Sequence, residues 1–115
     1  MANILTQKPI RIDTDITSFR NAAAVTALGW TQGIRVTKLV LAVGSGGASS
    51  AGTVAITDQN GATLYPTIPV AASIAANSIL STDEPTNAKG DLTWRDFAVT
   101  GVTATGTVLW LWYAV

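Results

Sequence analysis

Apolar residues between positions 53 and 70 recur at every second position, which is the period of a β-strand. Asn60 and Gly61 interrupt this alternation, and both residue types tolerate the positive φ that tight hairpin turns require. The pattern therefore predicts a β-hairpin. Pro66 and Pro69 cannot donate hydrogen bonds to a ladder, so the second strand of this hairpin should lie at a sheet edge or contain a bulge.

The apolar pattern of residues 34–43 changes phase in the middle of the segment. Its apolar residues fall into two sets that would occupy opposite faces of an extended chain: Ile34 and Val36, then Leu39, Leu41 and Val43. A slip at Thr37 and Lys38 predicts a β-bulge, which re-aims a strand. A strand whose far end is buried on both faces would give the same pattern, and the sequence leaves both interpretations open.

Other segments have strand-like patterns, and turn residues separate them at intervals of about ten residues. Strands are predicted over 18–28, 70–80, 92–101 and 107–115, with turns or loops over 29–33, 44–52, 81–91 and 102–106. Together the elements predict an all-β protein, an antiparallel β-sandwich or jelly roll. Pro9 and isolated apolar residues predict an extended N-terminal arm over residues 1–15, followed by one sandwich domain over residues 16–115.

Both faces of the segment 107–115 are apolar. One face carries the tryptophans and the other the leucines: Val108, Trp110, Trp112 and Ala114 against Leu109, Leu111, Tyr113 and Val115. A sheet of a small sandwich has one inner face, so the outer face of this strand needs a cover. A second copy of the chain is the simplest cover, which predicts a homo-oligomer. Alternation alone leaves open which face is the core.

The composition narrows the classes of partner. Charged residues make up 12% of the chain, and the seven basic and seven acidic residues cancel. With no basic run to contact phosphates, we expect no nucleic-acid partner. No apolar run reaches the roughly 20 residues that span a bilayer, and the N-terminus lacks the apolar region of a secretory signal. We therefore expect synthesis in a cytoplasm and no membrane partner.

The side chains that carry most enzyme chemistry are scarce. Histidine and cysteine are absent, which removes the usual triads, thiol nucleophiles and zinc ligands. Asp13 and Asp15 could contribute to a calcium site, but calcium needs 6–8 oxygen ligands and no third acid follows nearby. Asp91 and Asp96 are a formal glycosidase pair of the kind that any seven acids produce by chance. We expect no metal, no cofactor and no enzymatic activity.

The glycine-rich segment 44–52 is the one stretch that invites comparison with a phosphate-binding loop. It lacks the Gly-Lys-Ser/Thr of such a loop, and no helix pattern follows it. Its serines, Ser45, Ser49 and Ser50, have no plausible base nearby in the sequence. We therefore predict a plain connection.

Trp30 and Trp94 lie beside predicted turns. If exposed, either could be a stacking platform for a sugar or an anchor for a protein partner. If buried, each closes the core, and the sequence favours this second interpretation. The platform interpretation remains the basis of an alternative function.

Motifs over residues 34–115 resemble small structural proteins of tailed bacteriophages. The motifs are "AGTVAITDQNGATLYPTIPVAA" and "LTWRDFAVTGVTATGTVLWLWYAV", with an Asx-Gly hairpin, a W-R-D-F-x-V-T-G strand and a final T-G-T-V strand. The resemblance implies a jelly roll or β-sandwich that decorates a capsid as a cement protein, or that forms part of a head or tail fibre. It also implies a dimer or trimer, with the trimer favoured.

From the resemblance and the composition together we expect a non-enzymatic decoration protein on the outer surface of the phage head. Its partners would be the major capsid protein and its own copies. The resemblance implies that the N-terminal arm attaches to the capsid, with candidate contacts at Ile4, Leu5, Pro9, Ile10 and Ile12. The alternative is a carbohydrate- or receptor-binding tip of a phage fibre that uses Trp30 or Trp94.

Overall fold

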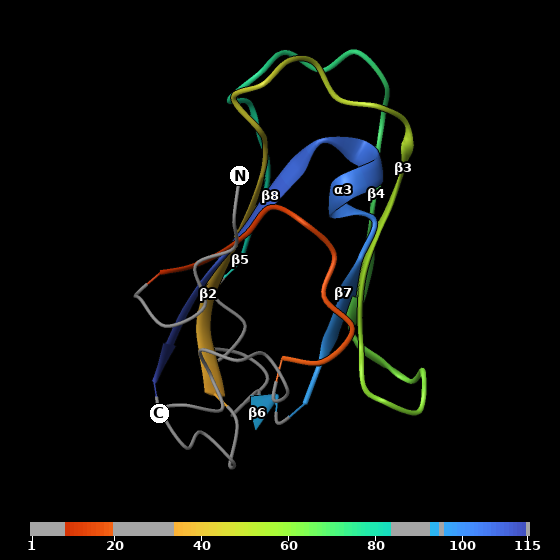
Figure 1. Ribbon diagram of the computed structural model, residues 1–115. Coiled ribbons are helices and arrows are strands. Elements are labelled where there is room, and N and C mark those ends of the chain that lie inside the picture. The colour runs from red at the N-terminus through yellow and green to blue at the C-terminus, as the bar shows by residue number, and fades with distance from the viewer. Residues whose placement is uncertain (1–8, 20–33, 84–92, 95, 115) are drawn as a thin grey trace.

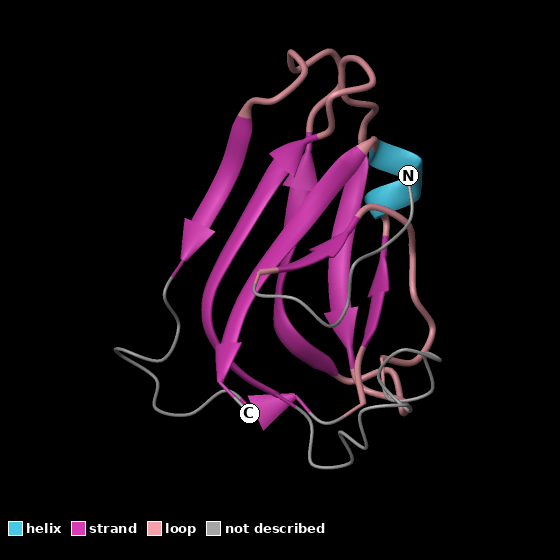
Figure 2. Ribbon diagram, turned by 60° about the vertical axis from the view of Figure 1, so that its left-hand side comes forward, coloured by secondary structure: helices cyan, strands magenta, loops and turns pink. Residues whose placement is uncertain are grey.

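The computed structural model describes residues 9–19, 34–83, 93–94 and 96–114, and they form two antiparallel sheets in a sandwich-like arrangement (Figure 1). Sheet A has the order β1 (Ile10–Ile12), β8 (Thr107–Ala114), β2 (Ile34–Val43) and β5 (Ile79–Asp83), and β6 (Thr93–Trp94) also pairs with β2. Sheet B has the order β4 (Thr63–Val70), β3 (Gly52–Thr57) and β7 (Ala98–Thr100). A one-turn helix, α3 (Val102–Thr105), lies at one end of the two sheets (Figure 2). The predicted antiparallel two-sheet architecture is confirmed.

The predicted hairpin is β3 and β4. Asp58 closes its loop, because one carboxylate oxygen accepts the backbone N–H groups of Asn60 at 2.8 Å and Ala62 at 2.9 Å. Gly61 supplies the positive φ, 85°. The strand β4 lies at an edge of sheet B, so the position inferred from Pro66 and Pro69 is confirmed.

The predicted bulge lies in β2. Its register with β8 passes from Val36–Tyr113 to Lys38–Trp112, which leaves Thr37 as the extra residue. Because the bulge inserts one residue, Val36 on one side and Leu39 and Leu41 on the other all have 0% exposure. The phase change in the sequence therefore keeps both apolar sets in one core.

The segment 92–101 forms two short strands in different sheets instead of the single strand expected. Trp94 of β6 pairs with β2 in sheet A, whereas Val99 of β7 pairs with Ile56 in sheet B. Phe97, which lies between the two strands, is fully buried and stacks on Phe19 with ring centroids 4.6 Å apart. The chain changes sheet at this point because its aromatic side chains fill the core between the sheets.

The strand expected over residues 70–80 is wrong for most of its length. After Val70 the chain makes two turns, and Ser73 and Asn77 adopt left-handed φ values of 65° and 66°. Ser49 binds this loop in place of a strand ladder. Its hydroxyl donates to the Ala71 carbonyl at 2.6 Å and accepts the Ile74 N–H at 3.0 Å. A buried serine on a distant loop therefore decides the local structure.

Residues 10–19 connect one edge of each sheet. Ile10 and Ile12 of β1 are fully buried, and the Ile16 N–H and carbonyl exchange hydrogen bonds with Val99 at 3.0 and 2.9 Å. The red-to-orange segment in Figure 1 follows this crossing from β8 to β7. For residues 10–15 the prediction of a separate arm is therefore wrong, because these residues belong to the core and to the closure between the sheets.

The same burial overturns Ile10 and Ile12 as capsid contacts, since a side chain with no exposure cannot reach a partner. Pro9 is half-buried at the start of β1. The remaining arm candidates, Ile4 and Leu5, lie outside the described residues.

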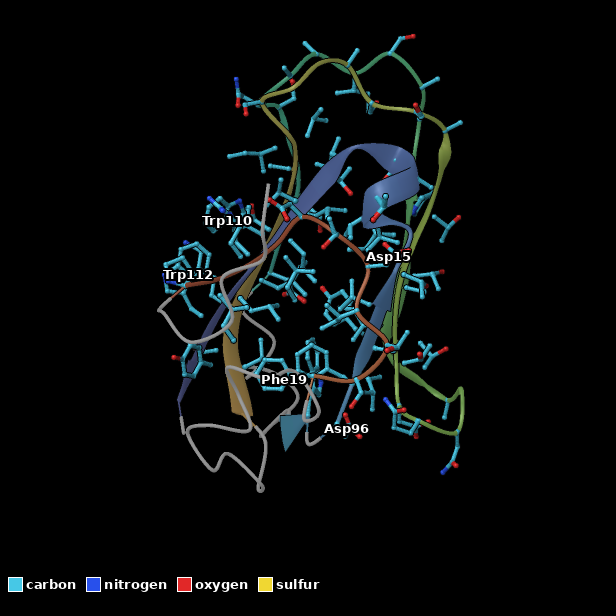
Figure 3. The ribbon with its side chains drawn as sticks, viewed as in Figure 1. Asp15, Phe19, Asp96, Trp110 and Trp112 are labelled. Atoms are coloured by element: carbon cyan, nitrogen blue, oxygen red, sulfur yellow. The ribbon has the colours of Figure 1, made fainter. Side chains whose placement is uncertain are left out.

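Helix α3 depends on two special residues. Gly101, at its N-cap, has φ 92° and no side chain to cap the helix. Asp15 supplies the cap from the N-terminal segment (Figure 3): its carboxylate accepts the Thr103 N–H at 3.1 Å, and its own N–H donates to the Thr103 hydroxyl at 2.9 Å. These two hydrogen bonds attach the crossing segment to the helix.

Replacing Gly101 with Ala should destabilise the fold strongly. A Cβ there would lie 2.0 Å from the Thr53 carbonyl oxygen, and the left-handed φ is strained for any side chain. Strain and overpacking together should cost about 2–5 kcal/mol of unfolding free energy in urea titrations. Gly46→Ala is the matched control, because its Cβ would meet nothing within 4 Å. Equal midpoints for the two variants would contradict this account of the turn.

Candidate functional site

The strand β8 resolves which of its two apolar faces is the core. Leu109 and Leu111 have 0% exposure and Tyr113 has 7%, because these side chains point toward sheet B. Trp110 and Trp112 alternate with them and point away from the interior (Figure 3). Both tryptophans are half-buried. Of the interface-or-core candidates, the leucines and Tyr113 are core, and the tryptophans are left for the outer face.

The register of sheet A places further side chains beside these tryptophans. Trp110 lies opposite Arg11 of β1 and Val40 of β2. Ala42 lies opposite Val108 on one side and Ile79 on the other. Side chains that face each other across antiparallel strands share a sheet face. We define the outer face by these residues: Arg11, Lys38, Val40, Ala42, Ile79, Thr82, Val108, Trp110 and Trp112.

The outer face is apolar at its centre. Ile79 is 68% exposed and is the large exposed hydrophobic residue of the described part of the chain. The Lys38 ammonium lies 5.1 Å from the centre of the Trp112 ring, a cation–π distance. Arg11 and Asp13 form an ion pair with an N–O distance of 3.7 Å, which reduces the net charge at that edge. An apolar, weakly charged sheet face is suited to contact with another surface.

A cleft of about 540 Å³ opens at the α3 end of the outer face. Its walls come from Arg11 and Asp13, from the end of β2 and the turn after it, from Asn77, from α3, and from Val108 and Trp110. Sequence patterning did not find this cleft, because residues far apart along the chain form it. The glycine-rich segment 44–52 contributes one wall, and its composition was the one feature of the sequence that could have indicated a cleft here.

Trp94 is not a ligand platform. It is 2% exposed, and its ring packs edge-on against Phe97 and Tyr65, with centroids 5.4 and 6.3 Å away. The platform prediction for Trp94 is therefore wrong, because the split between β6 and β7 directs the indole into the core. Trp30 lies outside the described residues.

The acidic candidates have structural partners where they are described. Asp15 caps α3, and Asp96 accepts a hydrogen bond from the Ser18 hydroxyl at 2.6 Å. Within the described residues, no group of three or more acidic, histidine or cysteine side chains could hold a metal ion. Asp91, the other half of the formal glycosidase pair, lies outside those residues. Asp13 and Asp15 gain no third carboxylate from the described part of the fold.

The serines of the glycine-rich segment have different environments. Ser49 is buried and binds the loop after β4. Ser45 lines the cleft. Ser50 is exposed, and its backbone N–H donates to the Thr105 carbonyl at 3.0 Å. Of the three, Ser45 alone lines the cleft.

Tyr65 joins the two sheets across one end of the core. Its hydroxyl donates to a carboxylate oxygen of Asp83 at 2.5 Å, which links β4 of sheet B to β5 of sheet A. Burial, the hydrogen bond to Asp83 and the negative charge of Asp83 raise the pKa of Tyr65 to about 12. Burial also raises the pKa of Tyr113 above its ordinary value.

Comparisons with protein-family models, with curated proteins and with solved structures found no match to this chain. Among the described residues no helix is long and apolar enough to cross a membrane.

Both tyrosines of the chain should resist ionisation in the folded protein. The raised pKa of Tyr65 means that its hydrogen bond stabilises the fold fully below pH 10, and that this stabilisation is lost as the pH rises through about 12. Tyrosinate absorbance, followed against pH with circular dichroism as a check on folding, should rise only above pH 10. Tyr65→Phe should remove the higher transition. Full tyrosinate absorbance at pH 10 in a folded protein would contradict the Tyr65–Asp83 bond.

Proposed function

We propose that the protein is a capsid decoration (cement) protein that binds the outer surface of a phage head and stabilises it. The observation that carries the proposal is the outer face of sheet A, where Trp110, Trp112 and Ile79 leave an apolar surface open on a single chain. The resemblance of the motifs in residues 34–115 to phage structural proteins supports the virion setting and implies the finer jelly-roll topology. Location on the capsid surface, after synthesis in the host cytoplasm, follows from the same resemblance.

Association through the outer face supports a structural role. Burying tryptophans in an interface gives large stabilisation for few residues, which is why they dominate many interfaces. We propose that copies of the chain cover this face for one another, and that the trimer is favoured over the dimer on the resemblance alone. The major capsid protein is the second partner. Neither nucleic acid nor a membrane is proposed as a partner, given the balanced charge.

The proposed role is non-enzymatic. The chain has no histidine or cysteine, and each described acid outside the cleft wall has a structural neighbour, such as Thr103 for Asp15 or Tyr65 for Asp83. A fibre-tip binding module was the alternative from the sequence. Of its two proposed platforms, Trp94 is buried and Trp30 lies outside the described residues, so the described residues give more support to the decoration role.

Changing Trp112 to Ala should give a folded monomer from an oligomeric wild type. The residue is half-buried on the outer face, so its loss should reduce self-association more than stability. Light scattering and circular dichroism measure the two effects. Leu111→Ala is the matched control one position away, and it should cost about 2–5 kcal/mol because Leu111 is fully buried. A wild type that is monomeric at high micromolar concentration would refute self-association.

Immunogold labelling of purified virions tests the location. The label should cover the head surface at many sites, since a cement protein binds repeating capsid subunits. Antibody against an unrelated cytoplasmic host protein is the control for carry-over. Label confined to the tail tip, or none on the particle, would contradict the decoration role.

A further inference from the structure

We propose that the cleft beside Trp110 binds a neutral saccharide, with one sugar ring stacked on the indole. The inference goes beyond the decoration role and does not depend on it, because residues of a single chain form the cleft. Its volume, about 540 Å³, falls within the roughly 300–1,000 Å³ typical of small-molecule sites. The case rests on the aromatic wall, the polar groups, the charge balance and the backbone of Asn77.

The aromatic wall suits a pyranose ring. Trp110 is half-buried and lines the cleft, so part of its side chain is accessible to a ligand. The C–H groups on one face of a sugar ring stack on indoles, because aromatic faces carry partial negative charge. Trp110 projects outward from β8, as Figure 3 shows, so a ring could approach it from solvent.

Three polar side-chain groups of the cleft are available to sugar hydroxyls. Asn77, Ser45 and Trp110 line the cleft, and none of their side chains makes a hydrogen bond within the described residues. An amide both donates and accepts, a hydroxyl does the same, and an indole N–H donates. A vicinal diol, which also donates and accepts, matches this set.

The charge of the cleft points to a neutral ligand. Arg11 and Asp13 are the charged residues among the described lining, and they form an ion pair at 3.7 Å. The Asp13 carboxylate would repel a phosphate or carboxylate ligand, and Arg11, the cation beside it, is already paired with Asp13. A neutral polyol meets no such repulsion.

The backbone of Asn77 is held in the conformation that presents its side chain. Its φ of 66° lies in the left-handed region, which asparagine adopts more readily than most residues other than glycine. Hydrogen bonds hold the turn, because the Asn77 N–H donates to the Val43 carbonyl at 3.1 Å and the Val43 N–H donates to the Ser78 carbonyl at 2.8 Å. A residue whose backbone is already fixed loses less conformational entropy when its side chain binds a ligand.

The experiment measures binding of four neutral disaccharides, maltose, cellobiose, lactose and chitobiose, by calorimetry and tryptophan fluorescence. At least one should bind and quench the fluorescence. Trp110→Leu and Asn77→Gly should each weaken that binding about tenfold, which corresponds to the loss of a contact worth about 1.4 kcal/mol. Asn77→Gly removes the amide but keeps the left-handed backbone, so it separates recognition from folding.

The chain offers a matched control for each variant. Trp112→Leu changes the other tryptophan of the same strand face, which does not line the cleft. Among the described residues, Ser73 and Asn77 are the two with left-handed φ that are not glycine. Ser73 lies outside the cleft, so Ser73→Gly is the control for Asn77→Gly. Measured at a dilution where light scattering shows every protein to be monomeric, both controls should bind within about twofold of the wild type, a difference well under 1 kcal/mol.

Three results would overturn the proposal. The first is no binding of any of the four disaccharides at millimolar concentration. The second is binding that survives both Trp110→Leu and Asn77→Gly, which would place the sugar elsewhere. The third is preferential binding of sialyllactose over lactose, which would show that the cleft recognises negative charge. Circular dichroism melts of every variant establish that a lost signal reflects recognition and not unfolding.

Discussion

The pairing of β8 with β2 is the interaction on which the rest of this structure depends. These two strands lie at the centre of sheet A, and their register fixes which residues of both strands point inward. The extra residue at Thr37 lets a strand with a phase change contribute one continuous set of buried side chains. Without that bulge, Val36 and Leu39 would face opposite sides, and one of them would be exposed to solvent.

The two sheets are held together by segments that belong to both. Residues 10–19 pair first with β8 and then with β7, and Asp15 between them caps α3. The segment from Trp94 to Val99 crosses in the same way, with Phe97 stacked on Phe19 inside. The hydrogen bond from Tyr65 to Asp83 adds a polar link between the sheets. The first described residues are thus as much a part of the core as the last strand.

The same register that buries the leucines of β8 leaves its tryptophans outside, and this has two consequences for function. The centre of the outer face is apolar and suits association, whereas its α3 end opens into a cleft with neutral polar groups. Trp110 stands at the boundary between them, opposite Val40 of the face and in the wall of the cleft. A copy that covers the whole face would also close the cleft, so association and sugar binding would compete at this residue.

Local pattern was enough to predict the antiparallel two-sheet class, the hairpin at Asn60 and Gly61, the edge position of β4 and the bulge at Thr37. Each follows from the period of apolar residues, the residue preferences of a turn or the missing N–H of proline. These effects act over a few residues. Contacts distant in the sequence decided the rest.

Both faces of β8 are apolar, so its own sequence does not select the buried face. The face that packs against sheet B became the core. Ile10 and Ile12 became core residues because β8 offered them an edge, and Trp94 was buried because its segment changes sheet. Hydrogen bonds of the Ser49 hydroxyl to Ala71 and Ile74 hold a loop where the local pattern favoured a strand. The cleft, which joins β1, β2, α3 and β8, exists only once those elements have packed together.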